Sequence, residues 1–143
     1  MILDKELQLA SNMALGNVAT ATLTNIVDLG SAGRDLGKYP PVAVIVAVTE
    51  AMTSADSTAT CLFILRSNDN EDMTTTPTTL YTTPAYGVTD LTLGKIIVLP
   101  FPQGGMAAAD RYVGVVKTVG TQNTTAGKIS AYLVFEWPSS KVA

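Results

Sequence analysis

The side chains that most often carry out enzyme chemistry are scarce in this sequence. Histidine is absent from all 143 residues, which removes the commonest general base and the imidazole metal ligand. Cys61 is the single cysteine, so neither a four-cysteine metal site nor an intrachain disulfide can form. Its place within an apolar, strand-like pattern indicates a small buried core residue. A pair of facing carboxylates, as in glycosidases, is the catalytic arrangement that remains.

The densest acidic group is Asn-Asp-Asn-Glu-Asp at 68–72, which places oxygen atoms at alternate positions as a calcium-binding loop does. Met73 stands where such a loop needs glycine for its sharp turn, and Thr79 stands where it needs a bidentate glutamate. A solvated acidic turn is therefore the favoured interpretation. We predict no catalytic, cofactor-binding or metal-binding residue and no enzyme activity, and keep a carboxylate-dependent hydrolase as a third hypothesis.

Charge and hydropathy limit the partners that the chain can have. The net charge is -3, and the nine Lys and Arg residues are scattered singly, so we expect no nucleic-acid partner. The longest apolar run, Val42 to Val48, is far shorter than the roughly 20 residues of a membrane helix. Charged residues near Met1 argue against a secretory signal, so we expect synthesis in a cytoplasm and no membrane partner. Only 15% of the residues are charged, which predicts a neutral exterior that favours association.

The elements that must position these groups are predicted to be β-strands. The sequence holds twenty Thr residues and frequent Val, whose branched side chains favour strands over helices. Alternating apolar residues indicate a half-buried strand at 128–137. The strand at 57–66 has an inward apolar row, but its opposite face is also apolar at Leu62 and Ile64, so we expect something to cover that end. The run at 42–48 is apolar on both faces, as in a central or interfacial strand. Further strands are expected at 23–29, 80–82, 95–101 and 112–119.

The strand count predicts an all-β protein with little helix, folded as an antiparallel β-sandwich. Residues 23–143 form the sandwich domain, and Gly120 to Gly127 is expected to join two long strands as a hairpin. Residues 1–22 lack a firm period and are either an arm that docks elsewhere or an edge strand of the sandwich. Candidate interface residues are those of the N-terminal segment, the second apolar faces of two strands, and a strand-end arginine: Ile2, Leu3, Leu7, Ile45, Leu62, Ile64 and Arg111.

Four segments, spread in order along nearly the whole chain, resemble a known family. They are Met-Ile-Leu-Asp-Lys-Glu-Leu at 1–7, Asn-Ile-Val-Asp-Leu-Gly at 25–30, Asp-Arg-Tyr-Val at 110–113 and Thr-Ala-Gly-Lys-Ile-Ser-Ala at 125–131. Together they resemble the cement, or capsid decoration, proteins of tailed bacteriophages, of the kind described for a Bordetella podovirus. The stretches at 73–83 and 100–105 match nothing in that pattern.

The resemblance implies a jelly-roll sandwich and a virion protein on the outer surface of an icosahedral capsid. It implies a partner, the major capsid protein with the HK97-type fold, and self-association, with a dimer favoured and a trimer possible. It implies no catalytic residue. The alternative hypothesis is a carbohydrate-binding β-sandwich module of a phage fibre or adhesin, because one fold hosts many functions.

Overall fold

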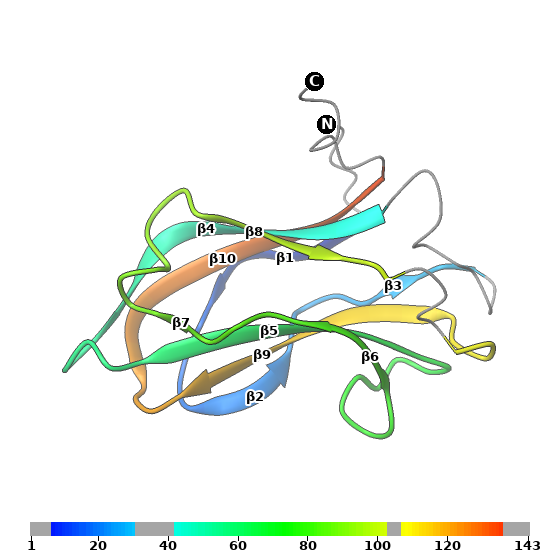
Figure 1. The fold of residues 1–143 in the computed structure, drawn as a ribbon, viewed down its shortest axis with the longest axis horizontal. Coiled ribbons are helices and arrows are strands. Elements are labelled where there is room, and N and C mark those ends of the chain that lie inside the picture. The colour runs from blue at the N-terminus through cyan, green and yellow to red at the C-terminus, as the bar shows by residue number, and fades with distance from the viewer. Residues whose placement is uncertain (1–6, 31–41, 103–106, 136–143) are drawn as a thin grey trace.

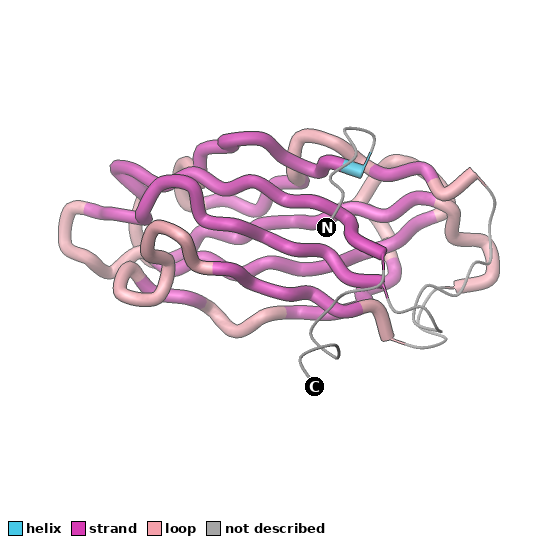
Figure 2. Tube along the Cα trace, turned by 90° about the horizontal axis from the view of Figure 1, so that it is seen from above, coloured by secondary structure: helices cyan, strands magenta, loops and turns pink. Residues whose placement is uncertain are grey.

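The computed structural model describes residues 7–30, 42–102 and 107–135, the side chain of residue 135 excepted. They form two antiparallel sheets packed face to face, which confirms the predicted β-sandwich (Figure 1). Figure 2 shows the strands running along the length of the molecule, with the loops gathered mainly at the two ends. The strands are β1 (Gln8–Ala14), β2 (Ala19–Thr22), β3 (Val27–Asp28), β4 (Val42–Ser54), β5 (Thr60–Asn68), β6 (Thr78–Thr82), β7 (Tyr86–Gly87), β8 (Ile96–Pro100), β9 (Tyr112–Gly120) and β10 (Thr124–Phe135).

We call the two layers sheet A and sheet B. Sheet A has the strand order β1-β10-β4-β8, and sheet B has the order β2-β9-β5-β6, with β3 also paired to β9 and β7 to β5. The described residues contain no α-helix, and none of their segments is a helix that could cross a membrane.

The apolar run at 42–48 is the start of β4, a central strand between β10 and β8. Val44, Val46 and Val48 point into the core between the sheets, where their exposed fractions are at most 3%. Ala43 and Ile45 point to the opposite face and are also buried, at 2% and 5%. The prediction of a strand buried on both faces is therefore confirmed.

Sheet B supplies the other half of the core. Cys61, Phe63 and Leu65 of β5 are fully buried, which confirms the inward row predicted for this strand. Burial of a Phe or Leu side chain contributes about 1.5–3 kcal/mol, so this alternation is a main source of stability. In β9, Val113, Val115 and Val119 share the inward face with Lys117, which is 5% exposed.

The expected hairpin between Gly120 and Gly127 is wrong. β9 lies in sheet B and β10 in sheet A, and the two strands do not pair with each other. The connection at 121–123 therefore crosses from one layer to the other. Two long strands that flank a polar turn look alike in sequence whether they pair side by side or face each other.

Two further crossings lie against this connection, at 15–18 between β1 and β2 and at 55–59 between β4 and β5. Asn123 accepts a hydrogen bond from the Val18 amide, and both the amide and the hydroxyl of Thr124 donate to the Gly16 carbonyl. Gln122 joins the same connection to the crossing at 55–59, because its side-chain oxygen accepts from the Asp56 amide and its side-chain nitrogen donates to the Asp56 carboxylate. The three crossings are thus bonded to one another.

Residues 8–14 and 19–22, which showed no clear period in sequence, form edge strands of sheets A and B respectively. The register of β1 shifts twice against β10, and Asn12 has a positive φ of 46°. Such bulges place consecutive residues on one face, here Leu9 and Ala10, both fully buried, and so erase the alternation that identifies a strand.

Candidate interaction surfaces

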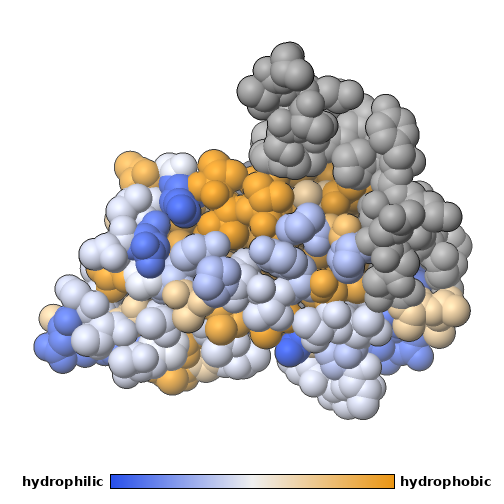
Figure 3. Space-filling view, in the orientation of Figure 1, coloured by the Kyte–Doolittle hydropathy of each residue, from blue (hydrophilic) through white to orange (hydrophobic). Residues whose placement is uncertain are grey.

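The outer face of sheet A carries apolar side chains from three neighbouring strands. Ile45 of β4 lies opposite Tyr132 of β10 on one side and Val98 of β8 on the other. Ile45 itself is 5% exposed and offers little surface, whereas Ile96 at the start of β8 is 50% exposed and Leu93, in the loop before β8, is 71% exposed. Figure 3 shows hydrophobic side chains gathered on the upper part of the molecule in this view. Exposed apolar groups that lie together are typical of binding surfaces.

The outer face of sheet B holds the other predicted apolar pair. Leu62 and Ile64 are half-buried in β5, opposite Thr118 and Val116 of β9. Val116 is fully buried although it points away from the main core. Part of this outer face is therefore covered by the chain itself, as the sequence expected for this end of the strand.

A loop packs onto the same outer face and supplies some of that cover. Met73 is 1% exposed, and a Cβ atom added at Gly114 of β9 would lie 2.7 Å from its Cγ. Arg66 of β5 is half-buried and donates a hydrogen bond from Nη1 to the Met73 carbonyl. Its Nε is buried and has no acceptor among the described residues. Glycine at 114 is thus what lets the loop approach the sheet.

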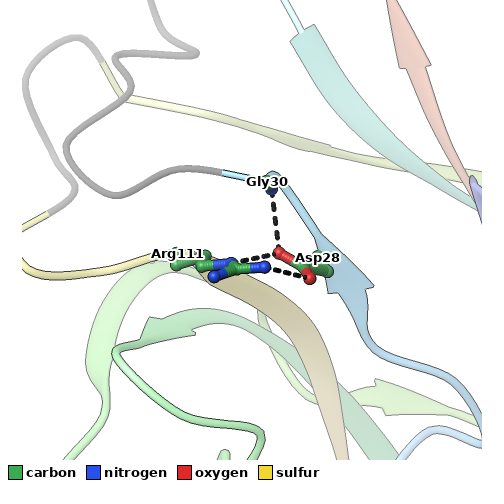
Figure 4. A network of polar contacts seen from close by, with 3 residues as sticks. All are labelled: Asp28, Gly30 and Arg111. Carbon is green, nitrogen blue, oxygen red and sulfur yellow. Dashed lines mark hydrogen bonds and ion pairs between the residues drawn. The ribbon is translucent and has the colours of Figure 1, made fainter.

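Arg111 lies immediately before β9 and pairs with Asp28 of β3 (Figure 4). Its Nε and Nη2 donate to the two carboxylate oxygens at 2.6 and 2.8 Å, and the Gly30 amide donates to Oδ1 of Asp28. The hydrogen bonds from Arg111, with that from Gly30, hold the pKa of Asp28 below its usual value, and the same carboxylate raises the pKa of Arg111. The predicted interface arginine therefore fastens β3 to β9, and its charge is already compensated.

Two of the remaining interface predictions, Ile2 and Leu3, lie outside the described residues, while Leu7 is partly buried and packs against the core. Among the described residues, the aromatic side chains that a glycan platform would need are mostly buried or partly covered. Phe63 and Phe101 are buried, and Tyr81 is the most exposed of the described tyrosines at 36%.

The acidic turn at 68–72 uses its oxygen atoms on its own backbone. Asp72 accepts hydrogen bonds from the amides of Thr74 and Thr75 and from the Thr74 hydroxyl, which lower the pKa of Asp72 to about 2. Asn70 accepts from the Asp72 amide. Within the described ranges, no three Asp, Glu, Cys or His side chains are grouped so that they could hold a metal ion.

Two buried titratable groups lie on the inner face of sheet B. Burial raises the pKa of the Cys61 thiol to about 12, although the nearby Lys117 acts in the opposite direction. Burial also lowers the pKa of Lys117, whose amine donates to the Leu15 carbonyl. Both groups are enclosed by the core.

Sequence reasoning missed Ile96, Val98 and Leu93 as surface residues. A signal was present, because the expected strand at 95–101 is apolar at its even as well as its odd positions, as the run at 42–48 is. In β4 the second apolar face is flanked by side chains from strands on both sides, whereas β8 has a neighbouring strand on one side only.

No curated protein matches the chain in sequence. A family model does match, described as Bbp16, over residues 13–133. The match spans strands β2 to β9 completely, the last two residues of β1 and all of β10 except its last two residues. The family is named like a Bordetella phage protein, which is consistent with a phage protein. The match covers well over half of the sequence, and the chain therefore belongs to the Bbp16 family.

Proposed function

We propose that this chain is a structural, non-enzymatic protein of a phage particle, which binds the outer surface of the icosahedral capsid and stabilises it by bridging major capsid proteins. The family match supports the phage origin, and the observation that carries the binding role is the apolar surface at Leu93 and Ile96. A monomer in water gains nothing from exposing these side chains, whereas a protein that covers them on a partner does.

The partner is the major capsid protein with the HK97-type fold, and copies of the chain associate with one another, as a dimer in preference to a trimer. A shell displays its binding sites in many identical copies. Linked copies of a weak binder then engage neighbouring sites at a high effective concentration, so each contact needs to bury only a modest area.

The direct test uses expanded capsids that lack the protein. Purified protein is added, the particles are sedimented, and the melting temperature of the capsid is measured by scanning fluorimetry with and without the addition. We expect the chain to sediment with the particles and to raise their melting temperature.

A matched variant controls for charge and nonspecific adhesion. Ala55 lies exposed in the turn between β4 and β5, so Ala55→Asp adds a charge away from both outer faces and should bind as the wild type does. Ile96→Asp places the same charge within the apolar surface and should bind less. Failure of the wild-type chain to sediment with any capsid form would show the proposal to be wrong.

A further inference from the structure

β8 is an edge strand of sheet A with a regular register. Residues 43–47 of β4 lie opposite residues 100–96 of β8 without a shift. The Val48 amide donates to the Lys95 carbonyl and the Phe101 amide donates to the Val42 carbonyl, so the odd-numbered residues of β8 face β4. Because backbone groups alternate along a strand, the N–H and C=O of Ile96 and Val98 point away from β4. No described strand pairs with that side of β8.

The other three edges of the sandwich are short or irregular. The register of β1 shifts twice, that of β6 shifts once against β5, and β2 has only four residues. Proteins commonly protect exposed edges in these ways, because an unpaired row of backbone groups invites another strand. Among the described edges, β8 alone combines a length of five residues with an unshifted register.

The side chains along this edge suit an apolar, extended partner. Ile96 is 50% exposed and Val98 is half-buried on the outer face of sheet A. Lys95 is the single charged residue from 91 to 101, and its amine lies 5.9 Å from the centre of the Tyr86 ring. Pro100 has no N–H, so the edge offers donors at Ile96 and Val98 only.

We propose that the edge of β8 receives an extended segment of the major capsid protein, which adds to sheet A as a further strand; this inference rests on the proposed function. An alternating row of amide donors and carbonyl acceptors is satisfied by another extended backbone, and pockets beside the strand select side chains at every second position. The segment that fits here is apolar at alternate positions, where it meets Ile96 and Val98.

The size of the edge argues for a partner held in an array rather than for a second copy in solution. A stable, isolated dimer usually buries at least 1,200 Å² or so in total, and one added strand beside five residues covers only a fraction of that. On a capsid, many such contacts act together and each is allowed to be weak.

Proline provides a selective test, because Val98→Pro removes an N–H that points away from β4 and leaves the bonds between β4 and β8 intact. Val98→Thr is the matched control, since it keeps both the N–H and the branched side chain. Ile96→Lys is a second test variant that needs no change in backbone, and circular dichroism and thermal melting check the fold of each protein.

Binding is measured by co-sedimentation with expanded capsids assembled from the major capsid protein. We expect Val98→Pro and Ile96→Lys each to weaken binding at least tenfold, and Val98→Thr to stay within about threefold of the wild type. Hydrogen exchange on the bound wild-type chain should slow at the amides of Ile96 and Val98.

Three results would overturn the inference. If both test variants fold and bind like the wild type, the edge is not the site although the proposed function stands. If the wild-type chain pairs with itself in solution and Val98→Pro abolishes that pairing, a second copy occupies the edge. If the wild-type chain does not bind capsids at all, the proposed function fails together with this inference.

Discussion

The side-chain amine of Lys117 donates a hydrogen bond to the carbonyl oxygen of Leu15, 2.5 Å away, on the inner face of sheet B. The amine belongs to β9, and the carbonyl belongs to the crossing at which the chain leaves sheet A for sheet B. Cys61 of β5 is the titratable group that acts on the pKa of Lys117, and it raises that pKa against the larger, lowering effect of burial. A charged amine that is 5% exposed thus depends on one backbone acceptor.

We predict that Lys117→Met raises the free energy of unfolding at pH 7, by about 1–2 kcal/mol, because it removes a poorly compensated buried charge. The folded-state pKa of Lys117 lies below the ordinary 10.5. Between that lowered pKa and 10.5 the unfolded chain binds more protons, so wild-type stability rises with pH relative to the variant. Urea unfolding of both proteins at pH 7 and pH 10 measures this. Cys61 contributes nearly equally in both proteins, because its folded-state pKa of about 12 lies above this range and the loss of Lys117 can only raise it. If the difference in the free energy of unfolding between Lys117→Met and the wild type were as large at pH 10 as at pH 7, the prediction would be wrong.

We predict that Cys61 reacts with an aromatic disulfide reagent only after the chain unfolds. The thiol is fully buried and its pKa is raised from 9.0 to about 12, so the reactive thiolate is scarce in the folded protein. Labelling at pH 8 should be about a thousandfold slower in buffer than in 8 M urea, because each unit of pKa lowers the thiolate fraction about tenfold, and burial slows the reaction further. Comparable rates in the two conditions would show that the core opens readily.

We predict that Gly114→Ala destabilises the fold by about 1–3 kcal/mol, as overpacking usually does. The added Cβ would meet the Met73 side chain at 2.7 Å, and Met73 is held at 1% exposure under its loop. Gly87→Ala is the control for adding a methyl group without crowding, because Gly87, like Gly114, has no positive φ and its added Cβ would lie 3.7 Å from the nearest atom. In a double-mutant cycle, Met73→Ala should recover part of the loss from Gly114→Ala. Simple additivity would mean that the two residues do not meet.

We predict that Asp28→Asn frees the end of β3 while hardly changing the melting temperature, because the pair with Arg111 is exposed to solvent. The Gly30 amide donates to the Asp28 carboxylate, so its hydrogen exchange should quicken. The pKa of Asp28 is lowered from 3.8, so its contribution is present above pH 3.8 and is lost as pH falls through the folded-state value. Arg111→Lys should have an intermediate effect, since it keeps the charge but not the two-pronged contact. Unchanged exchange at Gly30 in Asp28→Asn would refute this.

Much of the fold could be predicted from alternation. The inward rows of β5 and β10 and the doubly buried start of β4 follow from apolar side chains at every second position or at every position. β1 could not be recognised, because its bulges put Leu9 and Ala10 on one face. The partner of a strand was equally hidden, because period two identifies a half-buried strand without telling which sheet contains it.

The candidate surface was harder to predict than the core. Ile45 and Ile96 are both apolar residues in strands with two apolar faces, and the sequence around them does not show which strand is central. The strand order shows which of the two strands is central, since β4 has neighbouring strands on both sides and β8 has a neighbour on one side. Arg111 was chosen for its place at a strand end, but only the approach of β3 shows that Asp28 compensates its charge.

The three bonded crossings between the layers have a mechanical consequence. A pull that separates sheet A from sheet B loads three covalent spans at one end of the molecule, near Gly16, Asp56 and Gln122. The hydrogen bonds among these spans share the load, so no single crossing straightens before its neighbours resist. Under tension, the two layers at this end are therefore held by three covalent spans that resist together.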